Sequence, residues 1–312
     1  MQRALVTGGA GFIGSHLVEA LLARGVRVTV LDDFSTGRAE NLAHVRAHPA
    51  LVVVRGDIRD PAMLAQVMPT AEVVFHLAAF VSVPGSIEDP LTCVDINERG
   101  TARVLEAARQ AGVRRVVLAS SAAVYGDHAT LPLHEDLPPR ALSPYAASKV
   151  ANEALAQAYT HMGLPTVALR FFNVYGPRQR ADSPYAAAVP IFVERLRAGR
   201  APVVYGDGLQ TRDFVFVRDV AAALMAAADA SQAPGRAYNV CTGRAVSVLD
   251  LLAELYRFFP HAPDPEFARP RAGDIRHSVG DPDRAARDLG FRAATSLAEG
   301  LRALVQAAHD AP

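Results

Sequence analysis

A glycine-rich segment near the amino terminus, Gly8-Gly9-Ala10-Gly11-Phe12-Ile13-Gly14, constrains this chain more than any other feature. Residues 4–7 before it form an apolar run typical of a buried strand, and a helical pattern of leucine and valine follows it. Gly9, Gly11 and Gly14 match G-x-G-x-x-G, in which the missing side chains let the backbone approach a pyrophosphate at the start of a helix. The segment therefore predicts a strand, a tight turn and a helix that bind a dinucleotide.

A second strand is predicted over residues 26–31, and Asp32 stands at its end. Asp32 lies eighteen residues after Gly14, where dinucleotide-binding folds place an acid beside the adenosine ribose. A carboxylate there accepts hydrogen bonds from the 2′-hydroxyl and repels a 2′-phosphate. The residues therefore favour NAD over NADP.

Apolar runs continue along the chain and alternate with helical stretches such as residues 101–111 and 146–162. The further runs are residues 51–54, 72–77, 115–119 and 166–171. This alternation predicts an α/β fold with a Rossmann-type, doubly wound parallel sheet, whose strand C-termini meet at one edge. The candidate binding residues at that edge are Asp57 and Ile58, Leu77, Ala78 and Ala79, Ser120 and Ser121, and Asn173.

The composition changes after Gly176-Pro177 to segments rich in proline, glycine and arginine. This change predicts two domains. Residues 1–172 would form the NAD-binding Rossmann domain, and residues 173–312 a smaller C-terminal substrate-binding domain. The boundary stays open for residues 212–241, whose short extended pieces can return to the main sheet.

Tyr145 and Lys149 are four residues apart, which places a phenol and an ammonium on one face of a predicted helix. A free tyrosine ionises near pH ~10, so it accepts a proton at neutral pH only where a neighbouring cation stabilises the phenolate. Ser143 and Pro144 suit the cap and first turn of that helix, whose dipole also favours negative charge. The pair is a candidate general base, although the same spacing also occurs by chance on surface helices.

Charge and composition argue against several classes of partner. The 32 basic and 32 acidic side chains give a formal net charge of zero, and no basic block indicates nucleic acid or an anionic membrane. The apolar runs are too short to span a bilayer and no secretory signal is apparent, so we expect a cytoplasmic protein with a small-molecule substrate. Two cysteines, Cys93 and Cys241, and ten scattered histidines predict buried thiols, no disulfide framework and no metal.

Six motifs together resemble the extended short-chain dehydrogenase/reductases, and within them the NAD-dependent epimerase/dehydratase family that includes the UDP-glucose 4-epimerases. The motifs are residues 7–14, 57–58, 76–79, 120–126, 145–149 and 170–177. The resemblance spans nearly the whole chain. It implies a seven-stranded Rossmann domain that holds NAD, a C-terminal UDP-sugar domain, and a homodimer built from helices near residues 98–111 and 145–162.

The resemblance also implies a role for each candidate site residue. Tyr145 would take the proton of the sugar 4-hydroxyl, Ser121 would bond that hydroxyl, and Lys149 would hold the nicotinamide ribose. The implied cofactor contacts are Gly8, Gly11, Phe12, Ile13, Gly14, Asp32, Asp57, Ile58, Leu77, Ala78, Ala79, Tyr145 and Lys149. The implied UDP-sugar contacts are Ser121, Asn173, Val203, Tyr205, Arg212, Arg271 and Ser278.

Some of these residues keep an alternative interpretation. Surface solvation is the alternative for Arg212 and Arg271, and core packing is the alternative for Tyr205. Ser121 and Ser278 can each simply end a strand. The family places a residue near the sugar at the position of Ser278, and its small side chain favours entry of N-acetylated sugars.

The implied reaction is C4 epimerisation of a UDP-hexose through a 4-keto sugar. The expected pairs are UDP-glucose with UDP-galactose and UDP-GlcNAc with UDP-GalNAc. Related dehydratases and decarboxylases use acidic groups after the catalytic serine, where this chain has Ala122 and Ala123, so an epimerase is favoured. A UDP-glucuronate 4-epimerase stays an alternative. A non-enzymatic NAD-bound sensor is disfavoured because Tyr145 and Lys149 are both present.

Overall fold

The computed structural model describes residues 1–182, 187–270 and 275–309. Its centre is a seven-stranded, wholly parallel sheet in the order β11-β6-β5-β4-β1-β2-β3. The strands are β1 (Arg3–Thr7), β2 (Arg27–Asp32), β3 (Leu51–Arg55), β4 (Val73–His76), β5 (Arg115–Ser121), β6 (Thr166–Phe171) and β11 (Arg236–Val240). The strand order reverses between β1 and β4, and ligands of such sheets bind in the crevice at this reversal.

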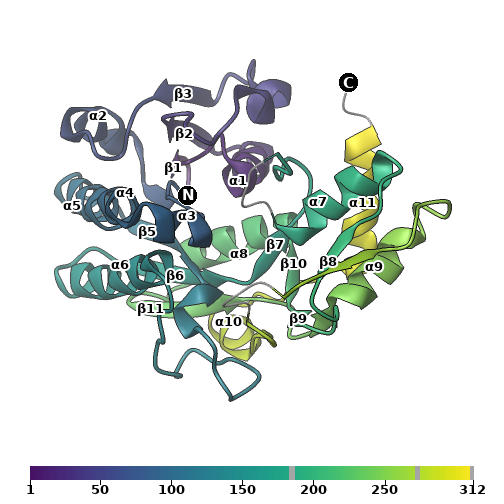
Figure 1. Cartoon of the computed structure of the whole chain (residues 1–312). Helices are drawn as coiled ribbons and strands as arrows, with labels where there is room; N and C mark the ends of the chain where they lie inside the picture. The colour runs from purple at the N-terminus through teal and green to yellow at the C-terminus, as the bar shows by residue number, and fades with distance from the viewer. Residues whose placement is uncertain (183–186, 271–274, 310–312) are drawn as a thin grey trace.

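Helices cover both faces of the sheet (Figure 1). On one face α1 (Phe12–Ala23) packs against α8 (Val217–Asp229) in an apolar cluster with the sheet. On the other face lie α2 (Pro61–Val67), α5 (Gly100–Gln110) and α6 (Pro144–His161). The short helical turns are η1 (Ala39–Val45), η2 (Met68–Thr70), α3 (Val83–Glu88), α4 (Pro90–Val94), the π-helical η3 (Asp95–Arg99) and η4 (Ala122–Tyr125).

The C-terminal part adds small sheets and helices around a second apolar cluster. Three strand pairs form these sheets: β7 (Asn173–Tyr175) with β10 (Phe214–Phe216), β8 (Val203–Tyr205) with β13 (Glu266–Ala268), and β9 (Thr211–Arg212) with β12 (Val246–Ser247). The helices are α7 (Ala188–Arg197), α9 (Val248–Tyr256), α10 (Asp283–Leu289) and α11 (Leu297–His309). Figure 1 shows α7, α9 and α11 on the side of the molecule away from α2 and α5.

The predicted fold class is confirmed: the chain folds as a Rossmann-type parallel sheet flanked by helices. The predicted strand over residues 166–171 has the observed bounds of β6. Residues 236–240 form β11, which is the edge strand of the main sheet beside β6. The segment 212–241 therefore supplies β10 to the C-terminal part and β11 to the main sheet, and the division into two domains stays a prediction.

Candidate active site

The glycine turn after β1 leaves room that side chains would fill. Gly8 has a φ of +70°, and a Cβ on it would lie 2.7 Å from the backbone nitrogen of Ala78. A Cβ on Gly14 would lie 2.2 Å from the carbonyl oxygen of Gly8. Gly11 caps α1 without any side-chain hydrogen bond, so the amides of the first helical turn can receive a ligand. The turn therefore fits a pyrophosphate at the start of α1.

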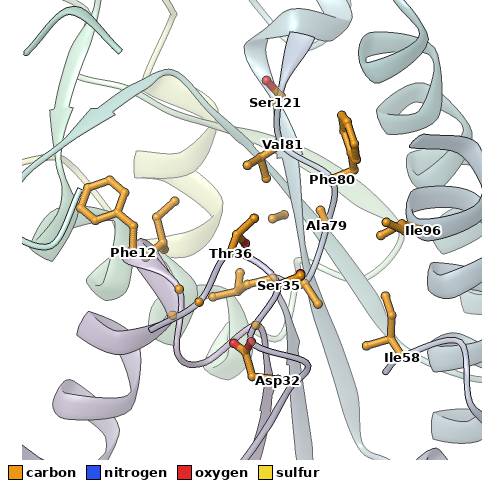
Figure 2. A pocket seen from close by; sticks show the side chains of 18 of the residues that line it. Phe12, Asp32, Ser35, Thr36, Ile58, Ala79, Phe80, Val81, Ile96 and Ser121 are labelled. Atoms are coloured by element: carbon orange, nitrogen blue, oxygen red, sulfur yellow. The ribbon is translucent and has the colours of Figure 1, made fainter. Parts of the chain in front are cut away.

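A cavity of about 640 Å³ extends from this turn along the C-terminal ends of the strands, within the usual size range of small-molecule sites. Figure 2 shows Asp32 at one end of the cavity and Ser121 at the other end. Asp32 ends β2 and Ser121 ends β5, and these strands are three strand spacings apart, or roughly 14 Å. This span suits an extended dinucleotide lying across the switch point.

All the predicted cofactor residues line this cavity. They are Gly8, Gly11, Phe12, Ile13, Gly14, Asp32, Asp57, Ile58, Leu77, Ala78, Ala79, Tyr145 and Lys149. Ser121 and Asn173, two of the predicted substrate residues, line it as well. The fold thus brings residues from seven different chain segments to one edge of the sheet.

The carboxylate of Asp32 accepts hydrogen bonds from two backbone amides, one in the glycine turn and one just after β2. Its Oδ2 accepts a hydrogen bond from the amide of Ala10 at 2.8 Å, and its Oδ1 accepts one from the amide of Phe34 at 2.9 Å. Burial raises the pKa of this carboxyl, and the two amide hydrogen bonds act in the opposite direction. Each carboxylate oxygen keeps a lone pair, so Asp32 can still accept from a ribose hydroxyl.

Arg59 is the basic residue at this end of the described lining, and two carboxylates hold it. Arg59 pairs with Asp57 at 2.6 Å and with Asp95 at 2.7 Å. The hydrogen bond from Arg59 lowers the pKa of Asp57. A guanidinium that already pairs with two carboxylates is poorly suited to neutralise a 2′-phosphate, which agrees with NAD as the preferred form.

Tyr145 and Lys149 lie in the first two turns of α6, at the other end of the cavity. Ser143 caps the helix by accepting from the amide of Ala146 at 3.1 Å, and Pro144 occupies the first helical position. Lys149 Nζ donates to the carbonyl of Ala119 at 3.0 Å and lies 5.6 Å from the centre of the Tyr145 ring.

The two side chains have opposite pKa shifts. Burial raises the pKa of Tyr145, and its hydrogen bond with Ser121 acts in the opposite direction. Burial lowers the pKa of Lys149 to about 8. The shift of Lys149 brings its pKa towards neutral pH, whereas the shift of Tyr145 moves its pKa away, so Tyr145 depends on the positive charge of Lys149 to act as a base. Such perturbed groups in a cleft are typical of catalytic sites.

Asn97 is a buried residue next to the cavity lining that the sequence reasoning missed. It lies in the π-helical η3, and its amide pairs with both backbone groups of Phe80, accepting at 2.7 Å and donating at 3.0 Å. The same amide donates to the hydroxyl of Ser148 at 2.9 Å, next to Lys149 in the chain. Asn97 therefore holds the loop that carries Phe80 and Val81, which line the cavity in Figure 2, against α6. No local pattern in the sequence marks Asn97, because its role depends on contacts with Phe80 and Ser148 that the fold creates.

Asp213 is a second residue that the sequence did not mark. Its carboxylate is buried and accepts hydrogen bonds from the amide and hydroxyl of Thr242 at 2.8 and 2.7 Å, and from the amides of Gly243 and Gly280 at 2.9 and 3.2 Å. Its carbonyl accepts from the amide of Asn173 at 3.0 Å. Asp213 therefore joins the cavity residue Asn173 to the C-terminal part.

The remaining substrate residues lie in the C-terminal part. Tyr205 lines a separate cavity of about 520 Å³, together with Gly206, Asp207, Gln210, Ala268, Pro270, Ile275 and Arg276. Val203, Arg212 and Ser278 line neither of these two cavities within the described residues. The amide of Ser278 donates to the carbonyl of Thr211 at 3.1 Å, which sets Ser278 beside β9 and near Arg212. Arg271 lies outside the described residues.

Within residues 1–182, 187–270 and 275–309, no group of three or more His, Cys, Asp or Glu side chains is arranged to hold a metal ion. No helix in that part of the chain is long and apolar enough to cross a membrane. Cys93 and Cys241 are both buried free thiols.

A parallel Rossmann sheet with a glycine turn, a carboxylate at the end of its second strand and a Tyr–Lys pair on one helix defines an NAD(P)-dependent enzyme of the short-chain dehydrogenase/reductase type. The family model described as "NAD dependent epimerase/dehydratase family" matches residues 4–241. The chain therefore belongs to the NAD-dependent epimerase/dehydratase family, and NAD is its cofactor.

Named relatives span the whole chain. It is 44% identical over 310 residues to a UDP-glucose 4-epimerase of Mycolicibacterium smegmatis, covering 98% of each sequence. The structure of a UDP-N-acetylglucosamine 4-epimerase from Methanobrevibacter ruminantium, in complex with UDP-N-acetylmuramic acid, matches with a TM-score of 0.95 at 36% identity and covers 99% and 98% of the two chains. A Thermus thermophilus UDP-glucose 4-epimerase in complex with NAD matches with a TM-score of 0.89 at 39% identity over 100% of both chains.

Other curated relatives have different names. They include a dTDP-glucose 4,6-dehydratase from Streptomyces griseus and a UDP-N-acetyl-alpha-D-glucosaminuronate decarboxylase from Bacillus cytotoxicus. The similarities as a group support a UDP-sugar epimerase, and the choice among related reactions depends on the residues of the site.

Proposed function

We propose that this protein catalyses the C4 epimerisation of UDP-hexoses through a 4-keto sugar, with NAD as a bound cofactor. The proposal depends on one observation, which is that the candidate catalytic residues and the candidate NAD-binding residues line the same cavity. Tyr145, Lys149 and Ser121 border its end at β5, and the glycine turn and Asp32 border its end at β2. A sugar next to Tyr145 would therefore lie beside the reacting end of a dinucleotide that is held at Asp32.

The chemistry assigns one task to each side chain. Tyr145 accepts the proton of the sugar 4-hydroxyl, and Ser121 holds that oxygen by a hydrogen bond. Lys149 stabilises the phenolate with its positive charge. Bound NAD supplies the acceptor for the hydride of C4 and returns that hydride later. The keto sugar would turn over in the pocket before the hydride is returned, so that the hydride would enter the other face of C4 while Tyr145 gives back its proton. The sugar is then inverted with no net oxidation.

The carboxylates of the cavity argue against loss of a sugar substituent. Among the described lining residues they are Asp32 and Asp33, at the end of β2, and Asp57, after β3. The turn after Ser121 carries Ala122 and Ala123, and the amide of Ala123 donates to the Ser121 hydroxyl at 3.1 Å. A dehydratase needs an acid near C5 and C6 to protonate the leaving hydroxyl, and this turn offers none.

A panel of UDP-sugars tests this proposal. Purified protein is incubated separately with UDP-glucose, UDP-GlcNAc and UDP-glucuronate, and the products are identified by proton NMR and mass spectrometry. We expect a C4 epimer of unchanged mass from at least one of the hexoses. A product lighter by one water would show a dehydratase, sole turnover of the glucuronate would show a UDP-glucuronate 4-epimerase, and no turnover of any sugar would favour a sensor.

We further propose that UDP-GlcNAc and UDP-GalNAc are accepted alongside the unsubstituted pair. Two observations support this: Ser278 is small and lies beside β9, and the similar structure from Methanobrevibacter ruminantium is a UDP-N-acetylglucosamine 4-epimerase. In Ser278→Tyr the added ring should suppress turnover of the N-acetylated pair and spare the other pair. Ser231→Tyr, in an exposed turn, is the control. Equal loss on both pairs, or none on either, would contradict a gate at Ser278.

We also propose that the protein is a homodimer. Ile87 and Leu91, on α3 and α4, are 63% and 81% exposed, and both helices contact α6. Apolar side chains in such exposed positions are typical of an interface. Light scattering should give twice the 33.2 kDa of one chain, and Leu91→Glu should reduce this mass. Leu209→Glu, at an exposed leucine of the C-terminal part, should leave it unchanged, and a single-chain mass for the wild type would contradict the proposal.

A further inference from the structure

Three side chains of α6 contact three successive residues at the end of β5. The contacts are Tyr145 with the hydroxyl of Ser121, Lys149 with the carbonyl of Ala119, and Glu153 with the hydroxyl of Ser120. Positions 145, 149 and 153 follow one another at intervals of four residues, so they lie along one face of the helix. The catalytic pair is therefore the first part of a longer row of side chains that ends at Glu153.

Glu153 is fixed in this row by an arginine of the neighbouring strand. Arg170, in β6, donates from Nε and Nη2 to the two carboxylate oxygens of Glu153 at 2.9 and 2.7 Å. The two side chains are only 7% and 15% exposed. A bidentate pair with so little exposure has one well-defined geometry. The carboxylate can therefore hold the Ser120 hydroxyl, and with it the strand end, at a fixed position.

Glu153 also carries the negative charge that faces Lys149. The titratable groups around Lys149 are Cys93 on α4, His76 at the end of β4, and Tyr145 and Glu153 on α6. Burial raises the pKa values of Cys93 and Tyr145 and lowers the pKa of His76 to about 3, so these three groups are neutral at pH 7. Glu153 therefore opposes the effect of burial on Lys149, and Arg170 holds it in place to do so.

We propose that Glu153 is a positioning residue of this active site, which keeps the end of β5 in register with α6 and keeps Lys149 in its cationic form. It acts through Ser120 and Lys149 and does not touch the reacting sugar. The inference rests on the proposed roles of Tyr145 and Lys149. A buried ion pair that only holds the fold together would affect neither the charge of Lys149 nor the turnover of the folded enzyme.

The sequence permits a direct test, because Lys149 is its only lysine. Protein labelled with ¹³C-lysine and loaded with NAD gives a single lysine Cε signal by NMR, whose pH titration reports the protonation of Lys149. We expect the midpoint in Glu153→Gln to lie roughly one pH unit below that of the wild type, a tenfold loss in proton affinity. Glu106→Gln, which removes the carboxylate of an exposed Glu–Arg pair on α5, should keep the wild-type midpoint.

An unchanged midpoint in Glu153→Gln would overturn the proposal. This measurement needs no sugar substrate, so it is independent of whether the protein proves to be an epimerase.

A second variant covers the case in which Glu153→Gln does not fold, since that change leaves Arg170 buried without its partner. Ser120→Ala removes the hydrogen bond between β5 and Glu153 and leaves the pair with Arg170 intact. We expect kcat to fall roughly tenfold to a hundredfold with KM unchanged, because the strand end that carries Ser121 loses one of its three contacts with α6 and is held less precisely. A folded Ser120→Ala variant with wild-type kcat would overturn the proposal.

Discussion

Lys149 differs from every other strongly basic side chain of this protein. The chain has 32 lysines and arginines, and Lys149 is the one lysine among them. Arginines keep their proton at any pH at which proteins fold, whereas a buried ammonium loses its proton readily. Lys149 is 3% exposed, and burial lowers its pKa to about 8. The charge beside Tyr145 therefore responds to pH in a range where the surface arginines do not.

Tyr145→Phe tests the general base. The change removes the phenol oxygen and keeps the ring, so kcat should fall by roughly 10²- to 10⁴-fold while the fold stays intact. Turnover of a UDP-hexose and the circular dichroism spectrum measure the two effects. Tyr159→Phe, about four turns further along α6, should keep wild-type turnover. Wild-type activity in Tyr145→Phe would rule out this base.

Lys149→Met should change the pH dependence of stability. The unfolded chain keeps the Lys149 proton up to about its ordinary pKa of 10.5, and the folded protein keeps it only up to about 8. Between these values the unfolded state binds more protons, so the free energy of unfolding rises with pH. Below them the folded state carries the cost of a buried ammonium, on the order of 3 kcal/mol.

The methionine variant carries no such cost at any pH. Its stability relative to the wild type should therefore be highest near neutral pH and should decline as the pH rises from 8 towards 10.5. Urea unfolding of both proteins across this range gives the difference. A difference that does not vary with pH would mean that Lys149 keeps its ordinary pKa in the folded protein.

At the scale of single residues, sequence reasoning succeeded where the chemistry depends on local spacing. The separation of Tyr145 and Lys149 by one helical turn is readable from the sequence, and the cavity contains both residues. Asn97 and Glu153 each bond to partners 17 residues away, and Asp213 bonds to one 67 residues away. Their roles depend on tertiary contacts, so no local pattern marks them.

At the scale of elements, the unit of β1, the glycine turn, α1 and β2 is the part of the site that depends most on backbone geometry. The turn lets the start of α1 come close to β1, and the amide of Ala10 within it bonds to Asp32 at the end of β2. Three elements therefore share one compact corner in which additional side-chain atoms cannot be accommodated.

Gly14→Ala should distort the glycine turn. Its Cβ would meet the Gly8 carbonyl at 2.2 Å, and since that neighbour is backbone the turn itself must move. We expect weaker NAD binding, measured by calorimetry on protein freed of nucleotide. Gly25→Ala, just after the same helix, is the control. Gly25 has a φ of +74° and open space around it. The substitution should therefore lower the free energy of unfolding by about 1–2 kcal/mol and leave the NAD affinity unchanged. Equal NAD affinity in both variants would mean that the turn tolerates a methyl group.

The apolar runs predicted the bounds of the strands closely. The main error is at the C-terminal end of β5, which carries the site residue Ser121. The predicted strand over residues 115–119 stops before Ser120 and Ser121, which the structure includes in β5. Ser120 and Ser121 pair with Arg170 and Phe171 of β6, so the ladder continues although the apolar pattern has ended. An apolar pattern reports the polarity of side chains and not backbone pairing, and for this reason it does not detect polar strand ends, even where a residue such as Ser120 is buried.

At the scale of the whole molecule, the C-terminal half completes the fold that the N-terminal half begins. β11 joins the main sheet beside β6, and α8 packs on α1. Asp213 and Asn173 connect the rim of the cavity to the small sheets. The composition of the sequence indicated a change near residue 176. The return of residues 236–240 to the main sheet could not be predicted in this way, because it depends on pairing with a strand about 70 residues earlier.

NAD should therefore stabilise the molecule as a whole. A ligand that binds only the folded state raises the free energy of unfolding, by about 4 kcal/mol at a thousand times its dissociation constant. Protein freed of nucleotide should show a higher Tm with NAD and a smaller increase with NADP, because Asp32 repels the 2′-phosphate. Asp32→Ala should reduce the difference between the two nucleotides. An equal increase with NADP in the wild type would contradict this role of Asp32.

The position of the only lysine also decides how the protein can be attached to other materials. Lys149 lines the cavity, so the outer surface carries no side-chain amine for dyes, cross-linkers or activated supports to react with. Amine coupling can then use only the terminal amine, which gives a single point of attachment, or it can reach Lys149 and inactivate the protein. The rate of inactivation during coupling would therefore measure how easily a reagent of a given size enters the cavity.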